Sequence, residues 1–81
     1  MAQELLLIDV PVGTQTTITT TNADAALDRR LHELGLRHGA EVTVVQKTAG
    51  GGRVVRTNST RYALDAQALR SIRVQHTEAA L

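Results

Sequence analysis

Residues 29–44 read RRLHELGLRHGAEVTV, a stretch in which a helix is expected to end and a β-strand to begin. The leucines before and within it recur at positions i, i+4 and i+7, the spacing of one helix face, which predicts a helix over Ala25–Leu34. These leucines are Leu27, Leu31 and Leu34. Gly35 is suited to the left-handed conformation that ends a helix, and Leu36 is then placed to contact Leu31 in a Schellman ending.

The residues on either side of this helix and turn support the same reading. Asn22 and Asp24 both precede the helical stretch and are good N-cap residues. After the turn, Glu41–Gln46 alternates, with Val42 and Val44 on one face and more polar residues on the other. We therefore predict a helix of two to three turns followed by a half-buried strand.

Upstream of the helix, a short apolar segment and a β-branched segment are separated by a turn. The apolar segment Leu5–Val10 is followed by a turn signal at Pro11–Gly13. In Thr14–Thr21, seven of eight residues are Thr or Ile, and such β-branched residues suit a strand. Ile18 is the only strongly apolar residue there, so we expect one wet face.

Downstream of the helix, short strands and turns follow one another. The expected elements are a glycine-rich turn at Ala49–Gly52, strands at Arg53–Thr57 and Thr60–Leu64 around a turn at Asn58–Ser59, one helical turn at Ala66–Arg70 capped by Asp65, and a strand with Ile72 and Val74. The sum is a mostly β chain of about five short strands plus the helix, which favours a small closed or half-closed barrel. We expect a single domain over residues 1–81 whose tail, residues 76–81, frays.

The predicted core combines one helix face with one face of several strands. Its members are Leu27, Leu31, Leu34, Leu36, Val42, Val44, Leu64, Ile72 and Val74.

Composition excludes several classes of function. The net charge is +1 and Tyr62 is the only aromatic residue, which argues against nucleic-acid binding. The longest apolar run, Leu5–Ile8, is too short to enter and span a membrane, and Gln3 and Glu4 stand where a secretory signal carries positive charge. Without Cys there are no disulfides or thiolate metal sites. We expect a soluble, cytoplasmic protein.

Catalytic and metal sites have little support in the sequence. His32, His38 and His76 do not form an i, i+4 ligand pair, so we expect no metal site and no cofactor, although zinc held at an interface by one of them is an alternative. The eleven Thr and two Ser hydroxyls lack an evident base and orienting carboxylate, which argues against an enzyme. The Gly50–Gly52 run lacks the Lys and Ser or Thr of a phosphate loop and reads as a hairpin turn.

Residues 29–44 also carry a family resemblance. An Arg-rich helix that ends in Leu-Gly-Leu, then two residues, a Gly and a Val-alternating strand, resembles the signature of the FeoA family of bacterial ferrous-iron uptake. The matching residues are Arg29, Leu31, Leu34, Gly35, Leu36, Gly39, Val42 and Val44. The opening LLLIDVPVG and the ending RYALDAQALRSIRV are also similar to the family pattern. The chain departs from it in two loops, TAGGGR at residues 48–53 and Asn58–Thr60.

The resemblance implies an SH3-like barrel that works by protein contact. It implies an accessory protein that binds the cytoplasmic part of the GTP-hydrolysing ferrous-iron transporter, as a monomer or a weak homo-oligomer. The alternative is an SH3-like metal-sensing or regulatory domain, related to the C-terminal domain of metal-dependent regulators of the diphtheria-toxin-repressor type. The Met1 start and the lack of DNA-binding helices favour the first reading.

Arginine is the most informative surface residue, because it outnumbers lysine eight to one and forms planar bidentate pairs with carboxylates. We predict a partner-binding patch on the helix, the turn after it and the glycine-rich loop. Its residues are Arg29, Arg37, His38, Ala49, Gly50, Gly51, Gly52 and Arg53. The alternatives are a solvated surface of biased composition, and an Arg29 that only pairs with Glu33 along the helix.

Overall fold

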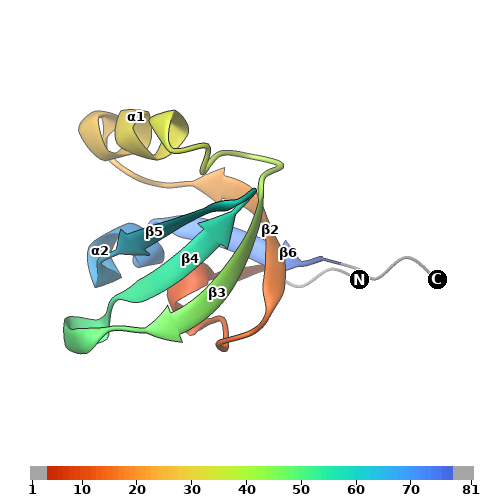
Figure 1. The fold of residues 1–81 in the computed structure, drawn as a ribbon. Helices are drawn as coiled ribbons and strands as arrows, with labels where there is room; N and C mark the ends of the chain where they lie inside the picture. The colour runs from red at the N-terminus through yellow and green to blue at the C-terminus, as the bar shows by residue number, and fades with distance from the viewer. Residues whose placement is uncertain (1–3, 78–81) are drawn as a thin grey trace.

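The computed structural model describes residues 4–77, which form one antiparallel sheet with the strand order β1-β6-β2-β3-β4-β5 (Figure 1). The strands are β1 (Glu4–Leu6), β2 (Gln15–Thr21), β3 (Glu41–Lys47), β4 (Arg53–Thr57), β5 (Thr60–Leu64) and β6 (Ile72–His76). The helices are α1 (Ala25–Glu33) and α2 (Ala66–Arg70), with 3₁₀ turns at Leu7–Asp9 and Ala49–Gly51. The predicted mostly β class is confirmed, with one strand more than the five or so expected.

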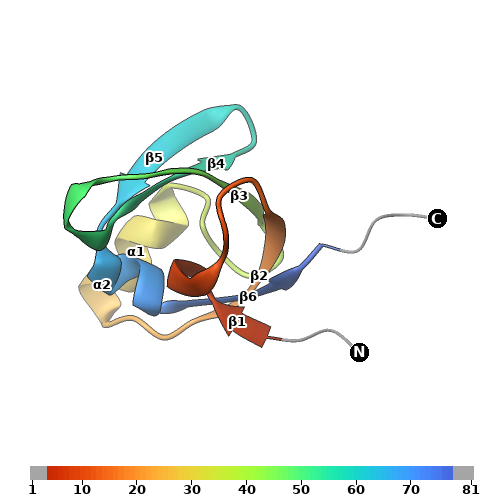
Figure 2. The same ribbon diagram turned by 90° about the horizontal axis from the view of Figure 1, so that it is seen from below.

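The sheet curls into a half-open barrel, with β5 and β1 at its two edges (Figure 2). The register shifts once between Ile18 and Thr20, where β2 pairs with β6, and once between Val44 and Gln46, where β3 pairs with β4. Such bulges bend a strand and increase its twist, so they let the long strands wrap around the core.

Helix α1 begins and ends as its sequence predicts. The Asp24 carboxylate accepts a hydrogen bond from the Leu27 amide at 2.8 Å, which caps the first turn. At the other end Gly35 has a φ of 86°, and the Leu36 amide donates to the Leu31 carbonyl at 2.8 Å. Together with a 3.0 Å bond from the Gly35 amide to the His32 carbonyl, this is the predicted Schellman ending.

Seven of the nine predicted core residues are buried, while Leu27 and Leu34 are only half-buried against them. The core also contains residues that the helix and strand phases left out. These are Leu7, Val10, Val55, Ala68 and Leu69; Ile18, the one strong core residue expected in Thr14–Thr21, is buried as well. Within the apolar segment Leu5–Val10, the turn at Leu7–Asp9 redirects the chain after β1, and both Leu7 and Val10 are buried.

The C-terminal end of the described chain is longer and better paired than predicted. The Asp65 carboxylate caps α2 by accepting from the Ala68 amide at 2.9 Å. Strand β6 continues through His76, which is the register partner of Thr16, and the Thr77 hydroxyl lies 2.9 Å from that of Thr17. The predicted frayed tail therefore does not start at His76, and its residues 78–81 lie outside the described part. Between residues 4 and 77, the helices are all too short or too polar to cross a membrane.

Candidate partner-binding surface

The structure separates the predicted patch into parts that lie at opposite ends of β3. Arg37 and His38 are exposed in the connection from α1 to β3, whereas the glycine-rich turn follows the other end of this strand (Figure 1). The seven residues of β3 span roughly 23 Å at about 3.3 Å per residue. Arg29 is exposed on α1. The predicted residues are therefore not contiguous, although Arg37 and His38 are neighbours.

The glycine-rich turn holds its own shape. Gly50 and Gly51 have φ values of 76° and 84°, which residues with a side chain rarely adopt. Gly52 is buried, and a Cβ there would lie 2.5 Å from the Thr48 hydroxyl oxygen. Arg53 Nη1 donates to the carbonyls of Gly51 at 3.0 Å and Gly52 at 2.8 Å, so this guanidinium is hydrogen-bonded to the turn that precedes it.

Arg37 and His38 line an open, polar cleft of about 590 Å³. The cleft lies where the α1–β3 connection meets the start of β3 and the end of β4. Its other lining residues are Gln15, Gly35, Gly39, Ala40, Glu41, Thr43, Arg56, Thr57 and Asn58. Arg56 was not part of the predicted patch. It comes to the cleft because it is the register partner of Thr43.

The cleft has an excess of positive charge. Its one carboxylate, on Glu41, accepts a hydrogen bond from Gln15 Nε2 at 3.1 Å. Within residues 4–77, the contacts shorter than 4.0 Å between a basic and an acidic side chain join the His32 imidazole to Asp28 and the Arg73 guanidinium to Glu4. The guanidinium groups of Arg37 and Arg56 thus have no carboxylate partner in the described chain, and neither does Arg29, which does not pair with Glu33.

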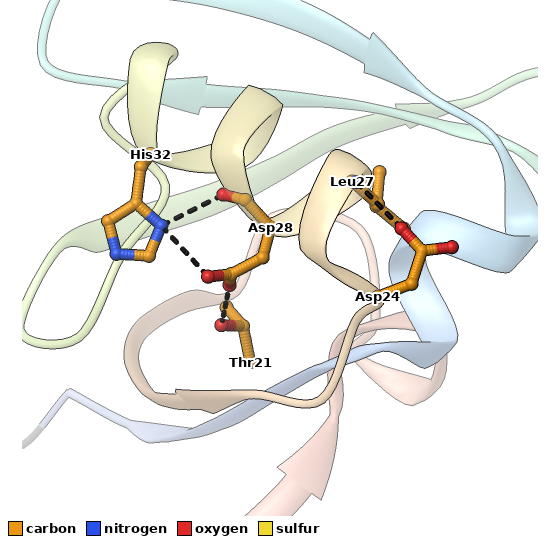
Figure 3. Close-up of polar contacts among 5 residues, drawn as sticks. All are labelled: Thr21, Asp24, Leu27, Asp28 and His32. Atoms are coloured by element: carbon orange, nitrogen blue, oxygen red, sulfur yellow. Dashed lines mark hydrogen bonds and ion pairs between the residues drawn. The ribbon is translucent and has the colours of Figure 1, made fainter.

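A polar cluster joins α1 to the end of β2 (Figure 3). The Thr21 hydroxyl donates to the Asp28 carboxylate at 2.6 Å, and His32 Nδ1 lies 2.8 Å from the Asp28 carbonyl and 3.6 Å from its carboxylate. Nδ1 faces two acceptors and therefore carries the proton. Because the carboxylate lies between the hydroxyl and the imidazole, His32 cannot take the proton of Thr21, and the cluster lacks the geometry of an activated nucleophile.

The same cluster bears on metal binding. With Nδ1 hydrogen-bonded to Asp28, only Nε2 of His32 faces away as a possible ligand atom. In the part of the chain that is described, no three His, Cys, Asp or Glu side chains gather where they could hold an ion.

A second, smaller groove lies between α1 and the β5–α2 corner and has a volume of about 130 Å³. It is lined by Leu27, Arg30, Leu31, Leu34, Ala63, Leu64, Asp65 and Ala68. This groove explains why Leu27 and Leu34, predicted to be core, are only half-buried: they form its wall.

The family model for the FeoA domain matches residues 5–76. The chain belongs to the FeoA family. Among curated proteins, none matches the sequence significantly.

Solved structures extend this family assignment. FeoA of Stenotrophomonas maltophilia, solved with zinc and described as an SH3 domain protein, is 32% identical, with a TM-score of 0.73 and coverage of 91% of this chain and 88% of that one. FeoA of Chlorobium tepidum is 24% identical, with a TM-score of 0.85 over 95% of this chain and 74% of that one. The SH3-like fold predicted for this FeoA domain is thereby confirmed.

A manganese-dependent transcriptional repressor shares the same fold. Its TM-score is 0.83 at 20% identity, and the match covers 95% of this FeoA domain but only 44% of the repressor. At that identity the likeness concerns the fold alone.

Proposed function

We propose that this FeoA domain is an accessory protein of ferrous-iron transport that acts in the cytoplasm by binding the GTP-hydrolysing part of the transporter. The observation that carries this proposal is the family match over residues 5–76. It is supported by the 32% identical Stenotrophomonas maltophilia FeoA, a protein described as a candidate bacterial ferrous iron transport activating factor.

A role through contact, without catalysis, agrees with the chemistry of the described residues. The Thr21–Asp28–His32 cluster links α1 to the end of β2, and its hydroxyl is hydrogen-bonded to the Asp28 carboxylate and not to the imidazole. The cleft lined by Arg37 and His38 is open and polar, which suits a segment of another protein better than a small molecule that must be enclosed. We place the primary contact at Arg37 and His38, and keep Arg29 and the Ala49–Arg53 turn as a separate, secondary contact.

Co-purification with the recombinant cytoplasmic GTPase domain of the cognate transporter tests this proposal. The wild-type chain is expected to retain the GTPase domain at low salt, and Arg37→Glu to retain much less, because charge contacts are least screened there. Arg70→Glu, an equal change of charge at an exposed position on α2, is the matched control. Absence of co-purification with the wild-type chain contradicts the proposal.

A second candidate function is a regulatory domain of the metal-dependent repressor type, favoured by the shared fold of the manganese-dependent repressor. The same tagged chain, used to capture proteins from cell lysate, separates the two. Recovery of a DNA-bound regulator in place of a membrane GTPase supports the second function.

A further inference from the structure

Two arginines lie directly opposite each other on the hairpin next to the cleft. Arg56 of β4 is the register partner of Arg61 of β5, and both are exposed. Directly opposed residues of an antiparallel pair have Cβ atoms about 4.5–5.5 Å apart, and like charges at such positions destabilise the sheet. The described part of the chain provides no carboxylate within 4.0 Å of either one.

These arginines continue a row of polar side chains across the sheet. Gln15 is the partner of Thr43, Thr43 is the partner of Arg56, and Arg56 is the partner of Arg61. Since Val42 and Val44 on either side of Thr43 are buried, alternation places the row on the outer face. Its positive end therefore adjoins the cleft that Arg37 and His38 line.

We infer that Arg56 and Arg61, together with Arg37 and His38 of the cleft, form one surface that binds an acidic segment of a protein partner. We call these four residues the arginine row. Guanidinium groups form bidentate hydrogen bonds with carboxylates, and such pairs would offset the repulsion between Arg56 and Arg61. Neighbouring strands lie about 4.8 Å apart, and carboxylates at alternate positions of an extended peptide are separated by roughly 6.7 Å. An acidic residue at every second position puts the carboxylates on one face of the segment, and the long, flexible arginine side chains can span the difference of about 2 Å between the two spacings.

The composition favours a protein segment over other anionic partners. A net charge of +1 creates no long-range field for a polyanion, and Tyr62 is the only aromatic side chain on which a base could stack. Among residues 4–77 the only large hydrophobic residue that is exposed is Val12, which does not line the cleft, so the arginine row lacks an apolar anchor for a lipid surface.

The inference refines the contact surface and rests on the proposed function for its biological meaning, but its test does not need the transporter. The ¹⁵N-labelled full chain is titrated with a capped peptide of alternating Glu and Ala and with the matching Gln–Ala peptide. The Glu peptide is expected to shift the side-chain Nε–H signals of Arg37, Arg56 and Arg61 saturably, and less so as salt rises. The Gln peptide is expected to shift none of them.

Arg61→Glu supplies the decisive variant, because it replaces a repulsive pair by an attractive one. The melting temperature is expected to rise by roughly 1–6 °C while the affinity for the Glu peptide falls about tenfold or more. Arg70→Glu, with the same change of charge on α2, is expected to leave that affinity within about twofold. A gain in stability together with a loss of binding supports the inference, since a merely structural arginine would not couple them in this direction.

Three results would overturn the inference. The first is a Glu peptide that shifts no arginine signal, and the second is an equal loss of affinity in Arg61→Glu and Arg70→Glu. The third is tighter binding of inorganic phosphate or of an oligothymidylate than of the Glu peptide. None of them bears on whether the transporter GTPase domain co-purifies, so the two proposals fail separately.

Discussion

Replacing Leu31 with alanine tests whether α1 is held on the sheet by its apolar face. Leu31 is 1% exposed and belongs to the central core. Truncating a buried leucine costs about 2–5 kcal/mol, because apolar burial is lost and a cavity remains. At 0.05–0.15 kcal/mol per residue, an 81-residue domain has a free energy of unfolding of roughly 4–12 kcal/mol. Leu31→Ala is therefore expected to remove a large part of the stability.

Thermal and urea unfolding followed by far-UV circular dichroism measure this loss, since Tyr62 alone gives a weak fluorescence signal. A loss of about 2 kcal/mol lowers the melting temperature of so small a domain by roughly 8 °C or more. Leu27→Ala is the matched control, because it removes the same atoms from the same helix at a half-buried position. The reasoning is refuted if Leu31→Ala melts with the wild type, or if both variants lose equal stability.

Three further predictions concern the turns and metal binding. Gly35→Ala is expected to cost about 1–2 kcal/mol in urea unfolding, because φ is 86° there; Gly35→Asn should cost less, and equal losses would contradict this reason. Gly52→Ala places a Cβ 2.5 Å from the Thr48 hydroxyl oxygen and 2.8 Å from the Leu64 carbonyl oxygen, so the free energy of unfolding is expected to fall by about 1–3 kcal/mol. Adding Thr48→Ala removes only the first clash and should restore part of this loss; full restoration would mean that the backbone contact does not matter. Calorimetric titration of tag-free protein with ferrous iron or zinc should reveal no one-to-one complex of submicromolar affinity, because residues 4–77 hold no set of three metal ligands. Such a complex would contradict this prediction and support the metal-sensing alternative.

The arginine row marks the boundary between what can be predicted locally and what cannot. The opposition of Arg56 and Arg61 follows from the two-residue turn at Asn58–Ser59, because a hairpin of that length pairs Thr57 with Thr60 and then Arg56 with Arg61. This signal was available in the sequence and was missed. That Arg37 and Arg56 line the same cleft could not be predicted, because it depends on the register of β3 against β4, which a bulge shifts between Val44 and Gln46.

The predicted patch failed to assemble for a related reason. Arg37 and Ala49 are close in sequence, but an extended strand between them carries the chain roughly 23 Å away. A helix of the same length would have advanced about 10 Å, so proximity in sequence is a poor guide to proximity on a β surface.

The family and the local structure could be predicted from the sequence, the latter in the Asp24 cap, the Schellman ending at Gly35 and the alternation of Val42 and Val44. These depend on hydrogen bonds and side-chain phases within a few residues of one another. The tertiary structure alone decided that Leu7 and Leu69 enter the core, that Leu27 and Leu34 border a groove, and that the cleft joins residues from β2, β3 and β4. The reason is that sheet register and curvature arise from pairings between distant segments, such as β2 with β6, whose free energy is shared by the whole sheet and is encoded in no single stretch of the chain.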